Sequence, residues 1–372
     1  MERKKIALID PVGTKASMDT YNTSLLSALW QNDVEGLLYS NFHWTENPDH
    51  AFPFFSDSIG HNLSDIVLLP LKYLKVIRHL KNRRCSSVII HIFHFNRLDE
   101  WILRKLRENN LQSIVIVHDV DSFVHSTDHS RMKRICDDLA DVLVVHSEFV
   151  RSELMSRISA SAAKKINVIP HGDFLSLASS GTSKTEARIM LKLDPDLPLV
   201  LFFGMIKPTK GMATLLRAWK FVQSNSTLFI AGRLRNISFK PFQTIIDEVP
   251  QSKNVRLMIR QVSKEERDLL FRSADLIVLP YTRIYHSGVL LMAMSYGVPV
   301  IVSRLGGFEE TIKHELNGLL FDPENSVELA TTINRLITDV SLSKKLSNNA
   351  LQTILIHHGW NNIAIKFKAL LS

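Results

Sequence analysis

The chain has 372 residues, and at about 150 residues per domain this length predicts two domains. Hydrophobic residues make up 45% and charged residues 22% of the sequence, which excludes the disordered and fibrous classes. The 45 lysines and arginines outnumber the 37 acidic residues, giving a formal net charge of +8. The two cysteines, Cys85 and Cys136, can form neither a disulfide framework nor a zinc knuckle, which favours a reducing compartment.

The N-terminal half has the pattern of a parallel α/β sheet. Its first apolar run, KKIALID at 4–10, ends directly in an acid, which favours a strand over a signal peptide. A helix is expected from about Asp19. Short runs rich in valine and isoleucine, typical of buried parallel strands, follow at 86–93, 113–119, 141–147 and 165–172.

The composition changes over residues 173–197, where serine, threonine and glycine are followed by Pro195 and, directly after the segment, by Pro198, as expected of a linker. A second alternating series of strands and helices begins at Pro198. Two such series predict an α/β fold of two Rossmann-like domains that face each other across a cleft. We expect residues 1–175 and a C-terminal helix at 357–372 to form one domain, and residues 176–356 the other.

One stretch is long enough to cross a bilayer, because residues 284–303 contain no charged side chain. Ser287-Gly288 and the segment 296–299 would interrupt such a span. The stretch therefore predicts a turn, a buried helix at 289–296 and a buried strand at 299–303, and no transmembrane segment.

Two features of the second series suggest an anion site. Lys207 and Lys210 stand where a strand ends and a helix begins, the place where open α/β sheets bind ligands. Ser287-Gly288 opens an apolar helix, whose first amides can hold an anion. Each alone has an ordinary explanation, solvated lysines in a turn or small residues at the start of a buried helix. Together they predict a diphosphate cradle.

The order of these segments resembles the retaining GT-B glycosyltransferases of family 4, which use nucleotide-sugar donors. The resemblance covers most of the chain. It is densest in FFGMIKPTKG, LFIAGR, SADLIVLPY, SGVLLMAMSYGVPVIVSRLGGFEE and NGLLF, and is looser in IVIVHD, VVHSEFVRSEL and VIPHGD. It implies a hexose transfer with retention of configuration and without a cofactor or a catalytic metal.

The resemblance also assigns roles to residues. Lys210 matches the lysine that contacts the donor diphosphate, and Lys207 stands near the place of a companion arginine, with Met205 in another such place. His118, at the end of IVIVHD, matches a histidine close to the transferred sugar, although an ordinary strand-end histidine is the alternative. The backbone that holds the distal phosphate corresponds to Ser287, Gly288 and Val289.

The chain departs from the family pattern at two places. Two family glutamates, one of which binds the donor ribose, correspond to Ile284 and Met292, and neither side chain can accept a hydrogen bond. The glycine-rich loop after the first strand keeps a single glycine, Gly13, expected to approach the donor.

Histidine clustering raises the alternative of a metal site, since eleven of the fifteen histidines precede residue 172. His91 and His94 point to opposite faces of a strand. His125 and His129 could share a helix face, but no carboxylate or cysteine completes the set. We expect no metal.

Residues 71–84 contain six basic residues and no acid, with leucines and isoleucine at near-helical spacing. Such a helix can lie on an anionic membrane surface. The alternative is an ordinary helix that packs its apolar face into the core.

The sequence thus predicts a cytoplasmic glycosyltransferase that moves a hexose from a UDP- or GDP-sugar to a saccharide acceptor, expected to be lipid-linked, in polysaccharide or glycolipid assembly, with peripheral membrane contact through 71–84. Competing hypotheses are a catalytically degenerate partner subunit and a sugar-nucleotide epimerase. A nucleic-acid-binding protein is suggested only by the net charge. An NAD enzyme is disfavoured because no G-x-G-x-x-G follows a first strand.

Overall fold

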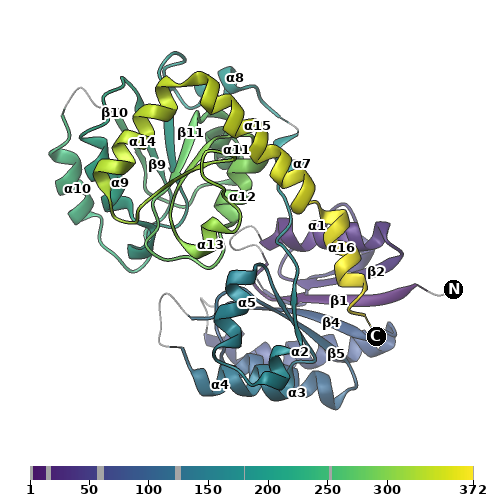
Figure 1. The fold of residues 1–372 in the computed structure, drawn as a ribbon. Helices are drawn as coiled ribbons and strands as arrows, with labels where there is room; N and C mark the ends of the chain where they lie inside the picture. Colours follow the sequence, from purple (N-terminus) through teal and green to yellow (C-terminus); the bar gives the residue numbers. More distant parts are fainter. Residues whose placement is uncertain are drawn as a thin grey trace. The chain divides into compact units, whose positions relative to one another are not determined.

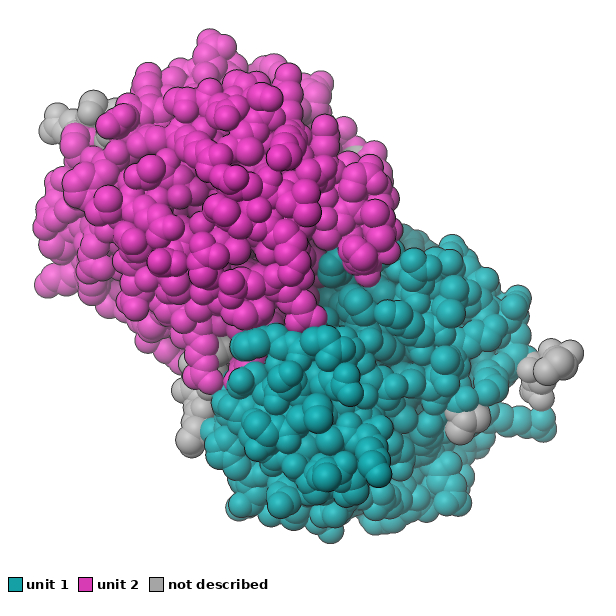
Figure 2. Space-filling model, viewed as in Figure 1, with its two compact units in different colours: residues 1–172, 358–372 teal, residues 173–357 magenta. Residues whose placement is uncertain are grey.

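The computed structural model describes residues 3–13, 18–56, 63–121, 127–179, 181–250 and 254–371. The chain divides into two compact units, coloured separately in Figure 2. The N-terminal unit comprises Met1–Gly172 and His358–Ser372, and the C-terminal unit comprises Asp173–His357. Each unit has its own parallel sheet (Figure 1).

In the described part of the N-terminal unit, seven parallel strands form one sheet in the order β3-β2-β1-β4-β5-β6-β7. Their bounds are β1 Lys4–Asp10, β2 Val34–Ser40, β3 Ala51–Phe52, β4 Ser87–Ile92, β5 Gln112–Val117, β6 Val142–Val145 and β7 Ile166–Val168. The helices are α1 Met18–Gln31, α2 Leu63–Asn82, α3 Arg97–Glu108, α4 His129–Arg134, α5 Glu148–Met155, α6 Ala160–Ala163 and α16 Trp360–Lys368. All the expected strands are present, each within a few residues of its predicted bounds.

The C-terminal helix α16 belongs to the N-terminal unit and lies beside α1 (Figure 1). Ile363 and Phe367 of α16 join Leu25 of α1 in one buried cluster with the sheet. The chain end is also fixed by hydrogen bonds from Lys4 Nζ to the Leu371 carbonyl at 2.9 Å and from Gln112 Nε2 to the Leu370 carbonyl at 3.0 Å.

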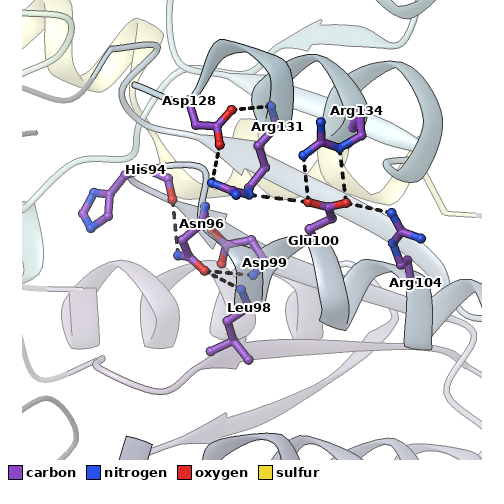
Figure 3. Close-up of polar contacts among 9 residues, drawn as sticks. All are labelled: His94, Asn96, Leu98, Asp99, Glu100, Arg104, Asp128, Arg131 and Arg134. Carbon is purple, nitrogen blue, oxygen red and sulfur yellow. Dashed lines mark hydrogen bonds and ion pairs between the residues drawn. The ribbon is translucent and has the colours of Figure 1, made fainter. Parts of the chain in front are cut away.

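Polar contacts hold α3 and α4 together (Figure 3). Asn96 caps α3 by accepting from the Leu98 and Asp99 amides, and burial raises the pKa of Asp99 to about 7. Glu100 forms ion pairs with three arginines: Arg104 at 2.7 Å, Arg134 at 3.3 Å and Arg131 at 3.4 Å. The hydrogen bonds from Arg134 and Arg104 lower the pKa of Glu100. Since two of the three arginines come from α4, the cluster fixes α4 against α3.

In the described part of the C-terminal unit, six parallel strands form a sheet in the order β10-β9-β8-β11-β12-β13. Their bounds are β8 Leu199–Phe203, β9 Thr227–Ala231, β10 Asn254–Met258, β11 Leu276–Leu279, β12 Val300–Ser303 and β13 Leu319–Phe321. The helices are α7 Leu175–Ala178, α8 Lys184–Met190, α9 Met212–Trp219, α10 Lys240–Asp247, α11 Lys264–Ser273, α12 Gly288–Ser295, α13 Gly306–Glu309, α14 Ser326–Thr338 and α15 Val340–His357.

Alternate residues of β8 belong to two different cores, one on each face of the sheet: Leu199 and Leu201 to one, Val200 and Phe202 to the other. Burial on both faces explains why this strand is continuously apolar.

The expectation of a linker at 173–197 is wrong. This segment contains α7 and α8 and is part of the C-terminal unit. Ser183 and Glu186 form a capping box at the start of α8. Arg188 of α8 is buried and bonds both the Ser273 carbonyl and the Asp275 carboxylate, which anchors the segment to the unit.

No helix among the described residues is long and apolar enough to cross a membrane. The uncharged stretch 284–303 forms a loop, α12 and β12, as expected.

Candidate functional site

The carboxyl ends of the N-terminal strands carry a cluster of aromatic and polar side chains. Asp10 ends β1, His91 lies near the end of β4, and His118 follows β5 directly. His146 and His171 follow β6 and β7. Tyr21 of α1 packs among the four imidazoles, with ring centroids 4.9 Å from His171, 5.3 Å from His91, 5.7 Å from His146 and 6.4 Å from His118.

Hydrogen bonds connect four of these elements in series. Asn22 Nδ2 of α1 donates to Asp10 Oδ2 at 2.8 Å. Asn22 Oδ1 lies 3.0 Å from His91 Nε2, and His91 Nδ1 lies 2.8 Å from His118 Nε2. The chain of contacts therefore runs from the end of β1 through α1 and β4 to the residue after β5.

His118 is held in place on two sides. Its amide donates to the Ile92 carbonyl at 2.9 Å. Its ring stacks on Phe93, with centroids 4.2 Å apart and planes 9° apart. The half-buried side chain is thus fixed in orientation at the strand end, the position for which the family resemblance implies a histidine close to the transferred sugar.

Burial keeps three histidines of this cluster, His91, His146 and His171, uncharged near neutral pH. It lowers the pKa of His91 and His171 to about 3 and that of His146 to about 4. His146 Nδ1 and His171 Nδ1 donate to the carbonyls of Ile169 and Gly172. Among the described residues, no group of three histidine, cysteine or acidic side chains is arranged to hold a metal ion, and His125 lies outside them.

Replacing His146 with asparagine should flatten the dependence of stability on pH. The folded-state pKa of His146 is about 4, whereas the unfolded one is about 6.5, so the unfolded chain binds more protons between these values and stability falls as the pH falls. At about 1.4 kcal/mol per pH unit, the wild type should lose about 2 kcal/mol more than His146→Asn between pH 7 and pH 5. Urea denaturation at both pH values measures this difference. His129→Asn, at an exposed position, is the control, and parallel profiles of His146→Asn and wild type would contradict the expectation.

Gly13, expected to approach the donor, lies buried in the loop after β1. A Cβ atom there would come within 2.4 Å of Ser40 Oγ and 2.7 Å of Phe42 Cε1. Packing against the end of β2 is therefore sufficient reason for glycine at this position. Residues 14–17 of the same loop lie outside the described residues.

In the C-terminal unit, Lys207 and Lys210 lie in the connection from β8 to α9, as expected. The Lys210 ammonium lies 3.5 Å from the centre of the Tyr281 ring, a close cation–π contact. The connection 204–211 between β8 and α9 is called the lysine loop below. The Thr282 amide donates to the Thr209 carbonyl at 3.0 Å, so the segment after β11 also fixes the backbone of the lysine loop.

Ser287 caps α12, its hydroxyl accepting from the Leu290 amide at 3.3 Å. The first amides of a helix have no partner within it, so those at the start of α12 can meet an anion. A Cβ at Gly288 would find its nearest neighbour, Phe174 Cζ, at 3.9 Å, so the backbone here is open to close approach.

The two elements expected to bind an anion, the loop with Lys207 and Lys210 and the start of α12, adjoin each other. A Cβ at Gly204, at the end of β8, would lie 3.6 Å from Val289 Cγ2 of α12. Tyr281, which contacts Lys210, is fully buried. Burial raises the pKa of its hydroxyl, and an interaction with Ser287 opposes that rise. The structure thus brings together Lys210, Ser287 and Val289 at one end of the sheet.

Ile284 and Met292 belong to the buried core of this unit, 9% and 4% exposed. The same core cluster contains Phe308 and Leu290. Apolar packing explains why the chain has no carboxylates at these positions.

Two residues near the lysine loop were missed by the sequence analysis, Tyr281 and Arg235. Arg235, after β9, places its Nη1 atom 3.7 Å from Met205 Sδ. A guanidinium thus reaches Met205 from a different strand, and sequence spacing cannot reveal that proximity. The aromatic residue following LIVLP was the available signal for Tyr281.

Comparisons with known proteins agree with these features. Residues 183–353 match the family model described as "Glycosyl transferases group 1". An uncharacterized glycosyltransferase of Methanocaldococcus jannaschii is 27% identical over 324 residues, 85% of this chain and 72% of that protein. A lipopolysaccharide 1,2-N-acetylglucosaminetransferase of Salmonella typhimurium is 23% identical over 312 residues, 80% of this chain and 77% of that protein.

Solved structures share the fold over nearly the whole chain. A sucrose-phosphate synthase from Thermosynechococcus elongatus has a TM-score of 0.75 at 22% identity, covering 99% of this chain and 98% of the other. HepE of Anabaena in complex with UDP-glucose has a TM-score of 0.76 at 17% identity, covering 98% of both chains. These likenesses confirm the expected architecture of two Rossmann-like α/β domains.

Proposed function

We propose that this chain, a glycosyltransferase of the GT-B superfamily, transfers a hexose from a UDP- or GDP-sugar to a saccharide acceptor with retention of configuration, as in family 4. The observation that carries the proposal is the adjoining of the lysine loop and the start of α12 within the unit that matches the group 1 model. The complex of HepE with UDP-glucose supports a nucleotide-sugar donor.

In this proposal the diphosphate is the leaving group. Its negative charge grows as the glycosidic bond breaks, and cations and amides already in position stabilise that charge without reorganisation. We assign the stabilisation of this charge to Lys207, Lys210 and the amides of Ser287, Gly288 and Val289. Arg235 would add a further cation. His118 would position the transferred sugar, and no side-chain nucleophile or metal is invoked.

Release of nucleoside diphosphate from a panel of UDP- and GDP-hexoses tests this function. Each donor is incubated with the full chain, with and without lipid-linked saccharides extracted from membranes. The proposal expects release from one donor class that rises on addition of acceptor. Nucleoside diphosphate release that does not depend on the acceptor would favour an epimerase or a hydrolase. Donor binding without release would favour a non-catalytic partner subunit.

We further propose that the acceptor is lipid-linked, in polysaccharide or glycolipid assembly at the cytoplasmic face of a membrane, and that α2 contacts this membrane. Ile77 and Leu80 of α2 are buried, as in an ordinary domain helix. Its earlier turns instead leave apolar side chains exposed beside basic ones: Val67 at 72%, Leu71 at 55%, Leu68 at 45% and Leu74 at 42%, next to Lys72, Lys75 and Arg78. This combination suits an anionic lipid surface.

Leu71→Ser and Lys75→Gln should each weaken binding to vesicles that contain phosphatidylglycerol. At about 1 kcal/mol per basic residue near the surface, removal of the Lys75 charge alone should reduce binding roughly five-fold. Flotation assays at low salt measure it, with Val340→Ser, at an exposed position of the C-terminal unit, as control. Equal binding of wild type and both variants, or equal binding to uncharged vesicles, would rule out this role for α2.

A further inference from the structure

The segment that follows β11 holds the lysine loop through two consecutive residues. The Tyr281 ring lies under the Lys210 side chain, with the Nζ atom 3.5 Å from the ring centre. The Thr282 amide donates to the Thr209 carbonyl at 3.0 Å. The backbone contact therefore fixes the loop directly before Lys210, and the ring contact fixes where the Lys210 ammonium lies.

The Tyr281 ring is itself held in place. It is fully buried, and it packs against Phe308 with ring centroids 5.3 Å apart. Its hydroxyl interacts with Ser287, the residue that caps α12. One ring thus contacts both elements expected to bind an anion: its face contacts Lys210, and its hydroxyl contacts the start of α12.

A cation–π contact and a phosphate contact are compatible at one ammonium group. The ammonium of a lysine is compact and has three N–H donors. The ring attracts it electrostatically, most strongly where water is excluded, and covers only one of its sides. A phosphate that approaches from another side can replace solvent or a weaker partner there, so that the ring and the phosphate hold the same cation between them.

We propose that Tyr281 is a positioning residue for the donor diphosphate: its ring keeps the Lys210 ammonium in place near the start of α12 while the phosphate binds. The role toward the phosphate rests on the proposed function, whereas the coupling between Tyr281 and Lys210 does not. A ring that only fills the core is insensitive to the electron density of its face, but a ring that holds a cation depends on it.

Fluorination of the ring separates these two roles, because each fluorine withdraws electron density from the ring face and changes its shape little. The full chain is prepared as Tyr281→Phe and with analogues of that phenylalanine that carry one, two or three ring fluorines. Calorimetric titration gives the Kd of UDP and of GDP for each protein. Tyr281→Phe keeps the ring face, so its affinity for the nucleotide that binds should stay within about two-fold of wild type.

The ring with three fluorines should weaken nucleotide binding roughly five-fold relative to Tyr281→Phe, with the other analogues in between. The same series at Phe271 is the control, because this ring is also fully buried in the same core cluster but packs edge-on against another ring, that of Phe203. Fluorination of Phe271 should leave the nucleotide affinity unchanged.

Urea denaturation tests the contact without any ligand. Tyr281→Phe and its analogue with three fluorines are each combined with Lys210→Met, which gives a double-mutant cycle. The fluorines should lower the equilibrium constant for folding roughly two- to five-fold more when Lys210 is present than in Lys210→Met. Equal losses of stability in both backgrounds would show that the ring does not hold Lys210, and would overturn the proposal.

The nucleotide titrations can also overturn it. Affinity for the bound nucleotide that does not change with fluorination would show that the ring has no role toward the phosphate. Tighter binding by the fluorinated proteins would show that the ring holds Lys210 away from the phosphate. A protein that binds neither UDP nor GDP but shows the coupling of Tyr281 to Lys210 in urea would refute the proposed function alone.

Discussion

Replacing Lys210 with alanine should reduce the transfer rate by roughly 10²–10³-fold, the loss typical for a group that stabilises charge in the transition state. Its ammonium lies over the Tyr281 ring, which holds it in the loop between β8 and α9 near the start of α12. A charge fixed in this way acts on the leaving diphosphate without first having to be ordered. Steady-state kinetics with the identified donor measure the effect.

Matched variants separate the charge of Lys210 from its packing. Lys210→Arg keeps the charge and should retain more activity than Lys210→Ala, although the larger guanidinium cannot sit on Tyr281 in the same way. Lys240→Ala removes an exposed lysine of the same unit and should leave the rate unchanged. A Lys210→Ala rate within two-fold of wild type would contradict the assigned role.

Two glycines of the C-terminal unit should respond to alanine in opposite ways. Gly211, just after Lys210, has a φ of 64°, and a Cβ there would lie 1.7 Å from the Pro280 carbonyl oxygen. Gly211→Ala should therefore destabilise the protein by about 3 kcal/mol or more, through strain and overlap together. Gly288→Ala should stabilise it by about 0.4–1 kcal/mol, because its Cβ meets only an ordinary contact and the unfolded chain loses freedom.

Donor affinity should fall in Gly288→Ala despite the gain in stability. The new methyl group stands at the helix start, where close approach of a phosphate needs an uncovered backbone, so we expect donor KM to rise roughly ten-fold, or about 1.4 kcal/mol. Denaturation curves and donor titrations on the same preparations give both quantities. Unchanged donor KM in a stable Gly288→Ala protein would show that no donor group approaches this backbone.

Much of the fold could be predicted because the signals are local. Buried parallel strands require continuous apolar runs, and these mark β1, β4 to β7, β8, β9, β11 and β12 in the sequence. The segment at 173–197 was misjudged from its composition. What attaches it to the C-terminal unit is the contact between Arg188 and Asp275, which are 87 positions apart.

The candidate site, too, could be predicted from the sequence only where the signals are local. Loop position and residue type suffice to place Lys207, Lys210 and Ser287 at strand or helix ends, since carboxyl ends of parallel strands lie on one edge. The Tyr281 ring under Lys210 and the series from Asp10 to His118 depend on side-chain positions brought together only by the sheet. The frequency of histidines in the N-terminal half indicates a cluster, but it does not reveal that Asn22 connects this cluster to Asp10.

The most direct test of the central claim is a thermal-shift comparison of the wild type and Lys210→Ala with UDP, GDP, ADP and their hexose conjugates. A ligand that binds only the folded state at a hundred times its Kd stabilises it by about 2.7 kcal/mol. Our account predicts a rise in Tm with either the uridine or the guanosine compounds that is largely lost in Lys210→Ala. No shift with any nucleotide, or the same shift in both proteins, would contradict a donor site at the lysine loop and α12.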